Sequence, residues 1–216
     1  MQWTLVVPLK PLARAKSRLS DTAGDGVRPG LALAFAQDTV AAALAARAVR
    51  GVLVVTDDDL AARELAALGA RTVPEDSHDS PRDGLNAALR HGTAVVRAVR
   101  PQSPVAALNA DLPALRPEEL TRVLDAAAAF PRSFLVDAAG IGTTLLAAAP
   151  GHDLSPAFGP ESRLRHRHSG AVELALDTVD SVRQDVDTGD DLRAALTLGV
   201  GPRTAAAAAR LLIPGQ

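Results

Sequence analysis

Aspartates near the ends of two apolar segments are the residues of this sequence best suited to chemistry on phosphates. In ALNADLP, residues 107–113, an apolar run ends at Asn109, Asp111 follows, and Pro113 turns the chain. Mg²⁺ prefers hard oxygen ligands and commonly takes one or two carboxylates together with phosphate oxygens and water. We therefore predict that Asp111 holds Mg²⁺ against the phosphates of a nucleotide. The alternative is an aspartate that only caps a turn.

A second acidic group lies in RQDVDTGDDL, residues 183–192. We expect Asp185 and Asp187 to point to opposite faces of an extended stretch, so that only one of them joins Asp111 at a metal. A helix is predicted to begin at about Thr188, and acidic side chains stabilise the free N–H groups of a helix start. The two aspartates after Thr188 are interpreted in that way. For Asp185 and Asp187 both roles stay open.

The segment VVPLKPLARAKSRLSD, residues 6–21, is a third candidate, because the loop after a first strand commonly binds phosphate in α/β proteins. It lacks the usual glycines but contains Lys10 and Lys16, the only lysines among the 23 basic residues of the chain. A lysine ammonium neutralises a polyphosphate as a compact point charge, and Arg14 and Arg18 add positive charge. We predict a triphosphate-binding loop; a solvated basic loop is the alternative.

Small and hydroxyl-bearing residues form a fourth candidate in IGTTLLAA and FGPESRLRH. These segments supply hydroxyl and glycine positions at Thr143, Thr144, Gly159 and Ser162, and Gly159 with Ser162 at a helix start would suit a phosphate or carboxylate. The arginines and histidines that follow, His166 among them, are interpreted as a solvated surface helix. The two histidines of that helix are separated by one residue, whereas a helical metal pair needs a spacing of roughly three or four. A zinc site is therefore not expected.

The composition excludes several classes of protein. A net charge of −2 and 2% aromatic residues provide neither the basic surface nor the stacking platforms of nucleic-acid-binding proteins. Cysteine is absent, which excludes disulfides, thiolate metal sites and cysteine nucleophiles. The sequence has neither a signal-peptide pattern nor the run of roughly 18 apolar residues that a membrane span needs. We expect a cytoplasmic protein without a nucleic-acid or membrane partner.

Short apolar runs alternate with longer helical patterns in the first part of the chain. This alternation predicts four strand–helix units, and hence a mostly parallel sheet covered by helices. Ligands of such sheets bind beyond the carboxyl ends of the strands, so the segments after the strands are expected to form the site. Strands are expected at 3–7, 51–56, 70–75 and 104–111, and helices at 30–47, 59–69, 82–99 and 116–130.

The alternation of strand and helix patterns ends in the second half of the sequence. Two strand-like runs, 132–140 and 141–150, are joined at a glycine and predict a β-hairpin inserted into the sheet. We expect one α/β domain, 1–216, with residues 1–115 mainly binding nucleotide and 116–200 mainly binding a second substrate. The remaining predicted elements are a short helix at 160–170, a strand at 172–179, a helix from about Thr188 and a helix at 203–212.

These motifs together resemble a known family. VPLKPLARAKSRLS, VVTDD, GLNAAL, NADLP, GTT, FGPES and DVDTGDDL are similar, in collinear order from Val6 to about Leu192, to the guanylyltransferases that begin assembly of the deazaflavin coenzyme F-420. PLKPLARAKSRL is the specific part, because the wider superfamily carries a glycine-rich loop there. The resemblance implies a Rossmann-like, GT-A-like nucleotidyltransferase fold. It also implies that a phosphorylated three-carbon acid attacks GTP: phosphoenolpyruvate, or else 2-phospho-L-lactate or 3-phosphoglycerate.

The resemblance further implies roles for individual residues. Asp111 and Asp187 match the metal-binding carboxylates, with Asp185 the less favoured neighbour, and the implied metal is Mg²⁺. Lys10, Lys16 and Asp111 are implied to act in catalysis. Three residues match the phospho-acid site: Thr144, Gly159 and Ser162. The implied GTP-binding residues are Pro8, Leu9, Lys10, Lys16, Arg18, Asp83, Gly84, Asn86 and Asn109.

Two other functions stay open. A nucleotidyltransferase for a molybdenum cofactor or a sugar phosphate fits the same fold, but it would carry the glycine-rich loop. A non-catalytic nucleotide-binding regulator would not need two metal carboxylates. With phosphoenolpyruvate the implied product is labile, which favours direct hand-off to the next transferase of the pathway.

Overall fold

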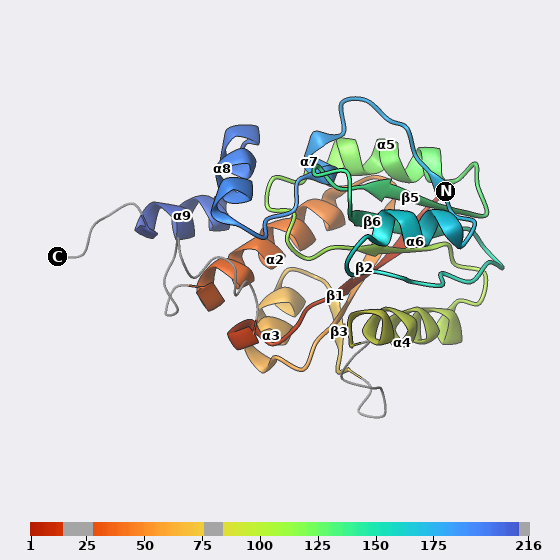
Figure 1. The fold of residues 1–216 in the computed structure, drawn as a ribbon. Coiled ribbons are helices and arrows are strands. Elements are labelled where there is room, and N and C mark those ends of the chain that lie inside the picture. Colours follow the sequence, from red (N-terminus) through yellow and green to blue (C-terminus); the bar gives the residue numbers. More distant parts are fainter. Residues whose placement is uncertain (15–27, 76–83, 212–216) are drawn as a thin grey trace.

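The fold is built around one sheet with helices on both of its faces (Figure 1). The computed structural model describes residues 1–14, 28–75 and 84–211. Within these residues the sheet has seven strands in the order β3-β2-β1-β4-β6-β5-β7. The strands are β1 (Trp3–Pro8), β2 (Val49–Val55), β3 (Arg71–Val73), β4 (Val105–Leu108), β5 (Arg132–Val136), β6 (Thr143–Ala148) and β7 (Val172–Glu173).

The helices connect these strands and extend beyond them toward the C-terminus. In the described part of the chain none of them is both long and apolar enough to cross a bilayer. They are η1 (Leu12–Arg14), α2 (Arg28–Ala45), α3 (Asp59–Ala67), α4 (Gly84–Val99), α5 (Pro117–Ala127), α6 (Ser162–His168), α7 (Asp180–Arg183), α8 (Gly189–Leu198) and α9 (Pro202–Leu211).

The parallel half of the sheet confirms the predicted strand–helix units. β1 pairs in parallel with β2 and β4, and β2 pairs in parallel with β3. Alternate residues of β1 face opposite layers: Leu5 and Val7 pack with α2, α3 and α5, whereas Val6 packs with α4. Because both faces are covered, these strands read as continuous apolar runs rather than as alternating ones.

The antiparallel half contains the predicted hairpin. β6 pairs antiparallel with both β4 and β5. Val136 of β5 pairs with Thr143 of β6, and the preceding residue, Leu135, pairs with Leu145. Thr144 is therefore an extra residue in β6, which is the pattern of a β-bulge. This bulge lies at the end of β6 nearest the hairpin turn, where a change of side-chain direction affects the neighbouring loops.

Two segments differ from the sequence prediction. The strand expected at 172–179 is limited to β7, because β7 is an edge strand that pairs only with β5. Residues 180–183 form the short helix α7, for which no element was predicted. The hydroxyl of Ser181 in this helix donates to the buried carboxylate of Glu119 on α5 (Oγ to Oε2, 2.8 Å). The predicted helix start at Thr188 is confirmed: Thr188 and Asp191 form a reciprocal capping box at α8.

Candidate active site

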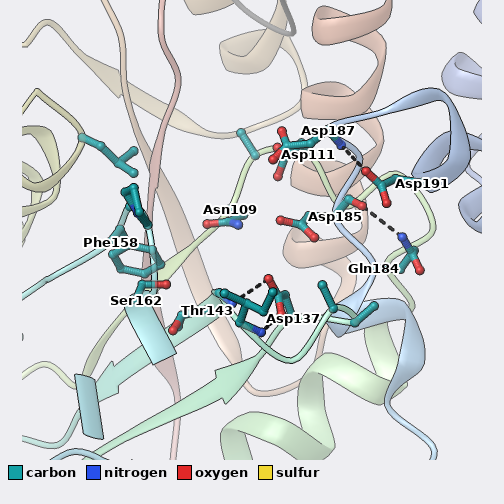
Figure 2. A pocket seen from close by; sticks show the side chains of 18 of the residues that line it. Asn109, Asp111, Asp137, Thr143, Phe158, Ser162, Gln184, Asp185, Asp187 and Asp191 are labelled. Atoms are coloured by element: carbon teal, nitrogen blue, oxygen red, sulfur yellow. Dashed lines mark hydrogen bonds between the residues drawn. The ribbon is translucent and has the colours of Figure 1, made fainter. Parts of the chain in front are cut away.

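A cavity of about 800 Å³ opens at the carboxyl ends of β1 and β4 (Figure 2). Its lining includes the residues that directly follow these two strands, as expected for a parallel sheet. The hairpin turn between β5 and β6 forms part of the opposite wall. Further wall segments are 158–162, before and at the start of α6, and the stretch from Gln184 to Asp191 that enters α8, and Ala32 of α2 and Leu85 of α4 complete the lining.

Asp111 is positioned by the turn that follows β4. The N–H of the next residue, Leu112, donates to Oγ1 of Thr39 on α2 (3.0 Å), and Thr39 donates in turn to the Phe35 carbonyl (2.7 Å). The carbonyl of Asp111 accepts from the N–H of Val186 (3.1 Å). This main-chain bond joins the turn after β4 to the acidic segment before α8, so the two acidic motifs of the sequence meet at one cavity.

Asp185 and Asp187 both line this cavity. The prediction that they point to opposite faces is wrong, because residues two apart in an extended segment share a face and the residue between them points away. That residue, Val186, is completely buried in an apolar cluster with Phe35 and Leu192. In Figure 2, Asp187 lies beside Asp111, and Asp185 extends nearer to the centre of the cavity.

The carboxylates fit a magnesium ion that is shared with a ligand. Within residues 1–14, 28–75 and 84–211, no group of three or more histidine, aspartate or glutamate side chains could hold a metal by itself. Mg²⁺ does not need such a group, because it takes one or two carboxylates and completes its shell with phosphate oxygens and water. Asp111 with Asp187 or Asp185 supplies that number of hard oxygen donors.

Two other carboxylates at the cavity hold the loops. Asp137 accepts from the N–H groups of Ile141 (2.9 Å) and Gly142 (2.8 Å), which closes the hairpin turn. A Cβ at position 142 would lie 2.3 Å from Oδ2 of Asp137, so a side chain there would displace the carboxylate that closes the turn. Asp191 accepts from both the N–H and the hydroxyl of Thr188 (each 2.8 Å). These two side chains are thus used within the protein.

The wall expected to bind nucleotide begins with Pro8, Leu9 and Lys10, which lie at the end of β1 and directly after it and line the cavity together with Asn109. The Lys10 side chain is exposed. Further along, the N–H of Leu12 donates to Oδ2 of Asp58 (2.9 Å). Asp58 also caps α3, and its hydrogen bonds from the N–H groups of Ala61 and Leu12 lower the pKa of its carboxyl. Asp58 thereby ties the start of the loop after β1 to α3.

Several predicted GTP-binding residues cannot be placed on this wall. Lys16, Arg18 and Asp83 lie outside the described residues. Gly84 is the first residue of α4 and is not among the residues that line the cavity. Asn86 is buried, and its amide forms two hydrogen bonds with the main chain of Phe158 (Nδ2 to O, 3.1 Å; N to Oδ1, 2.8 Å).

On the opposite wall the structure places Gly159 and Ser162 at the cavity, as the sequence analysis expects. Gly159 has a φ of +116°, and a Cβ there would lie 3.0 Å from the guanidinium of Arg165, so glycine is favoured twice over. Thr144 is completely buried and is not among the lining residues, whereas its neighbour Thr143 is. Because Thr144 is the extra residue of the β-bulge, only Thr143 reaches the cavity. No sequence pattern marks this bulge.

His166 is the polar residue that the sequence analysis placed wrongly. It is completely buried rather than solvated, and it packs against Phe134 and Phe158 at ring-centroid distances of 5.7 and 4.9 Å. Burial, aided by the positive charges of Arg132 and Arg165, lowers its pKa to about 4. The signal available in the sequence was the spacing of four between Ser162 and His166, which puts both on the buried face of α6.

The hydrogen bonds of His166 connect two parts of the cavity wall. Nδ1 lies 2.9 Å from Oγ1 of Thr143, and Nε2 lies 3.0 Å from the N–H of Ala157. Thr143 belongs to β6, and Ala157 precedes the segment with Gly159 and Ser162. One imidazole therefore holds the strand and the loop together beneath the cavity.

Two arginines fix the hairpin turn from outside. Arg163 on α6 donates to the carbonyl of Gly140 (2.8 Å) and forms a two-point ion pair with Glu173 of β7 (2.8 and 3.1 Å). Arg183 on α7 donates to the carbonyl of Val136 (2.9 Å). Neither arginine was a predicted site residue, and both act on backbone groups that only the folded chain brings near them.

Solved structures with this arrangement define the class of fold. A nucleotidyl transferase from Methanothermobacter superposes with a TM-score of 0.62 at 23% identity, over 91% of this chain and 97% of the other. A CMP:2-keto-3-deoxy-manno-octonic acid synthetase complexed with CTP gives 0.56 at 18% identity, over 92% and 98%. The chain thus has the nucleotidyltransferase fold, which confirms the fold expected from the sequence.

A narrower assignment comes from sequence similarity. The family described as guanylyl transferase CofC like matches residues 3–209, and the chain belongs to this family. A phosphoenolpyruvate guanylyltransferase from Streptomyces scabiei is 87% identical over 216 residues, all of both chains. Proteins of the same name from Streptomyces coelicolor (77%, all of both chains) and Thermomonospora curvata (62%, over 98% of this chain and 90% of the other) are also similar. The family resemblance of the motifs is thereby confirmed.

Proposed function

We propose that this protein transfers GMP from GTP to phosphoenolpyruvate and releases pyrophosphate, at the start of coenzyme F-420 assembly. The observation that carries the proposal is the 87% identity, over the full length of both chains, to a phosphoenolpyruvate guanylyltransferase. The cavity at the carboxyl ends of β1 and β4 supports it, because a nucleotidyltransferase needs room there for two phosphorylated ligands.

The nucleotide occupies the wall formed after β1 and β4. Pro8, Leu9 and Asn109 line that wall, and Lys10 supplies a positive charge for the triphosphate. The remaining GTP contacts are assigned by resemblance, and Lys16 shares the catalytic role of Lys10 as a second point charge on the leaving pyrophosphate. These further GTP residues are Lys16, Arg18, Asp83, Gly84 and Asn86.

Asp111 and Asp187 would hold Mg²⁺, with Asp185 as the less favoured alternative to Asp187. All three line the cavity, and the main-chain bond between Asp111 and Val186 keeps the two acidic segments together. When bound, Mg²⁺ neutralises phosphate charge and orients the reacting oxygens. The carboxylates themselves do not accept the proton of a nucleophile in this reaction.

The reaction joins two anions, and this determines what the protein must supply. A phosphate oxygen of phosphoenolpyruvate attacks the α-phosphorus of GTP, and the bond from that phosphorus to the oxygen bridging to the β-phosphate breaks. The nucleophile is already an anion at neutral pH, so no general base is required. The described lining of the cavity accordingly contains no histidine. Positioning and positive charge are the means of catalysis.

The acid occupies the wall that contains Gly159 and Ser162. Ser162 offers a hydroxyl, and Gly159 lines the cavity with its backbone. Thr144 is assigned to the same site by resemblance. The product is an enol phosphate joined to GMP, and its lability favours hand-off to the next transferase. The cytoplasmic location and the division of the domain at residue 115 stay predictions.

Pyrophosphate release tests the proposal. Purified protein is mixed with GTP, Mg²⁺ and one acceptor at a time: phosphoenolpyruvate, 2-phospho-L-lactate, 3-phosphoglycerate or a sugar phosphate. We expect kcat/KM for phosphoenolpyruvate to exceed that for each other acceptor by at least about tenfold. A clear preference for a sugar phosphate would assign the chain to a different nucleotidyltransferase reaction. Binding of GTP without turnover of any acceptor would support the regulator.

A further inference from the structure

The hydrogen bonds of His166 define its tautomer. The main-chain N–H of Ala157 can only donate, so Nε2 of His166 accepts and carries a lone pair. A neutral imidazole has one N–H, which must then be on Nδ1. The ring is neutral at physiological pH, because its burial among Phe134 and Phe158 disfavours the charged form and lowers its pKa to about 4.

This tautomer determines where the hydroxyl proton of Thr143 can point. Nδ1–H of His166 donates to Oγ1 of Thr143 over 2.9 Å, so this contact uses a lone pair of the hydroxyl and leaves its proton available. Among the described residues no protein atom accepts a hydrogen bond from Thr143 Oγ1. Thr143 lines the cavity, and its side chain lies near Ser162, away from Asp111 and Asp187 (Figure 2).

We propose that His166 is a positioning residue that holds Thr143 as a hydrogen-bond donor to an anionic oxygen of the phosphorylated acid. The inference rests on the proposed function and adds Thr143 to the acid site. A hydroxyl that already accepts from an imidazole N–H selects a ligand atom that accepts, such as a carboxylate or phosphate oxygen. The β-bulge at Thr144 brings Thr143 to the cavity wall, as bulges commonly do near active sites.

The second contact of His166 serves the same site in another way. By accepting from Ala157, the ring anchors the start of the segment that contains Gly159 and Ser162. The two contacts can be separated by substitution, because an asparagine amide can place an N–H near Nδ1 and a glutamine amide can place an oxygen near Nε2. His166→Asn thus retains the donor to Thr143, and His166→Gln retains the acceptor for Ala157.

Substitution of Thr143 tests the proposed contact with the acid. Thr143→Val keeps the shape and removes the hydroxyl, and we expect the KM for phosphoenolpyruvate to rise about tenfold while the KM for GTP changes less than about twofold. Thr143→Ser restores the KM for phosphoenolpyruvate to within about threefold of the original value. Thr72→Val, on β3 and away from the cavity, is the matched control. An unchanged KM for phosphoenolpyruvate in folded Thr143→Val overturns the proposal.

Substitution of His166 tests its positioning role. We expect His166→Gln to raise the KM for phosphoenolpyruvate about tenfold and His166→Asn to raise it less than about threefold. In a Thr143→Val background, His166→Gln adds less than about twofold, because its effect passes through the hydroxyl. An equal rise in both substrate KM values, or full additivity of the two substitutions, shows a purely structural histidine and overturns the proposal.

A measurement without substrate separates this inference from the proposed function. Nitrogen-15 NMR of the ligand-free protein at pH 7 is expected to show His166 protonated on Nδ1 and unprotonated on Nε2. The opposite tautomer overturns the inference whatever reaction the enzyme performs. If the wild-type protein fails to use phosphoenolpyruvate, the proposed function fails and the assignment of the acid contact fails with it. If the wild-type protein uses it and Thr143→Val has no effect, only the inference fails.

Discussion

The two walls of the cavity are built in different ways. On the acid side, buried polar groups are bonded to one another: His166 to Thr143 and Ala157, and Asn86 to both main-chain groups of Phe158. On the nucleotide side, the described wall consists of the chain that follows β1 and β4; Asp58 holds the chain after β1 through the N–H of Leu12, and the Lys10 side chain is exposed. The acid wall is thus fixed by side chains beneath it, and the nucleotide wall presents a charge directly to its ligand.

This difference matches the two ligands we propose. A three-carbon acid offers few contacts, so each hydrogen-bond donor of the protein must be in position before the acid binds. Buried hydrogen bonds in a low-dielectric environment hold the donors in these positions. A triphosphate offers many charged oxygens, and a point charge on a flexible side chain can follow them. Substitutions on the acid wall are therefore expected to change the KM for the acid, and those on the nucleotide wall the KM for GTP.

The largest effect is expected at Asp111, which lies between the two walls and serves both ligands. Asp111→Asn removes a charge that we propose holds Mg²⁺, and we expect kcat/KM to fall about 10³-fold for both substrates, on the order of 4 kcal/mol. Steady-state pyrophosphate release measures this. Asp190→Asn is the matched control, because Asp190 is exposed on α8 and pairs with Arg193. Retention of activity in Asp111→Asn would remove Asp111 from the metal site. Loss of activity in the control would mean that the effect is not specific to Asp111.

The buried His166 beneath the acid wall should make the folded protein less stable at low pH. The folded protein keeps this side chain neutral down to its pKa of about 4, whereas the unfolded chain protonates it near its ordinary value of 6.5. Between these pH values the unfolded state binds more protons, so the free energy of unfolding decreases as the pH falls from about 6.5 to about 4. The decrease is on the order of 3 kcal/mol. Urea unfolding at several pH values measures it.

The control for this prediction is His166→Gln, which cannot titrate. We expect its stability to fall less than that of the wild-type protein over the same pH range, so that the difference between the two isolates the histidine. Parallel curves for the two proteins would mean that His166 is protonated in the folded state as readily as in the unfolded chain.

Asn86 distinguishes the two walls, because the family resemblance assigns it to GTP and the structure bonds it to the acid wall. Asn86→Ala leaves the buried main-chain groups of Phe158 without their side-chain partner, and we expect a loss of about 2 kcal/mol in unfolding free energy. The KM for phosphoenolpyruvate should rise more than that for GTP. Gln37→Ala, which removes an exposed amide paired with Glu64, is the control. A rise confined to the KM for GTP would favour the role in recognising the base.

The smallest effect is expected at Lys10, because its side chain is exposed and shares its task with other positive charges. Lys10→Ala should lower kcat/KM for GTP about tenfold, through a lower kcat and a higher KM for GTP, and should raise the KM for phosphoenolpyruvate less than about threefold. Arg50→Ala, an exposed cation on β2 outside the cavity, serves as the control. If Lys10→Ala raised only the KM for the acid, the assignment of the two walls would have to be reversed.

The sequence predicted the framework well because the framework depends on local pattern. Buried parallel strands leave continuous apolar runs, and the predicted hairpin at residues 132–150 was confirmed as β5 and β6. The helix start at Thr188 was readable from its capping residues. The same local logic predicted that Asp111 follows a strand at the site, whereas Gly159, Ser162, Asp185 and Asp187 were candidates from their residue types and the family resemblance, and all five line the cavity.

What could not be predicted depends on contacts between distant segments. The spacing of Ser162 and His166 indicates only that both lie on one face of α6, and the packing of that face against Phe134 of β5 is a contact between distant segments. The choice between Thr143 and Thr144 depends on a bulge that is visible only in the register of β5 and β6. The shortened β7 reflects its position at the edge of the sheet. The error at Asp185 and Asp187 was of another kind, since strand periodicity alone places both on one face.

A competition experiment tests the central claim most directly. The protein, GTP and Mg²⁺ are supplied with equal concentrations of phosphoenolpyruvate and 2-phospho-L-lactate, and the GMP adducts are counted by mass spectrometry at early times. The account predicts that the phosphoenolpyruvate adduct exceeds the other by at least about tenfold, with one pyrophosphate released per adduct. A dominant 2-phospho-L-lactate adduct, or pyrophosphate released without any adduct, would contradict it.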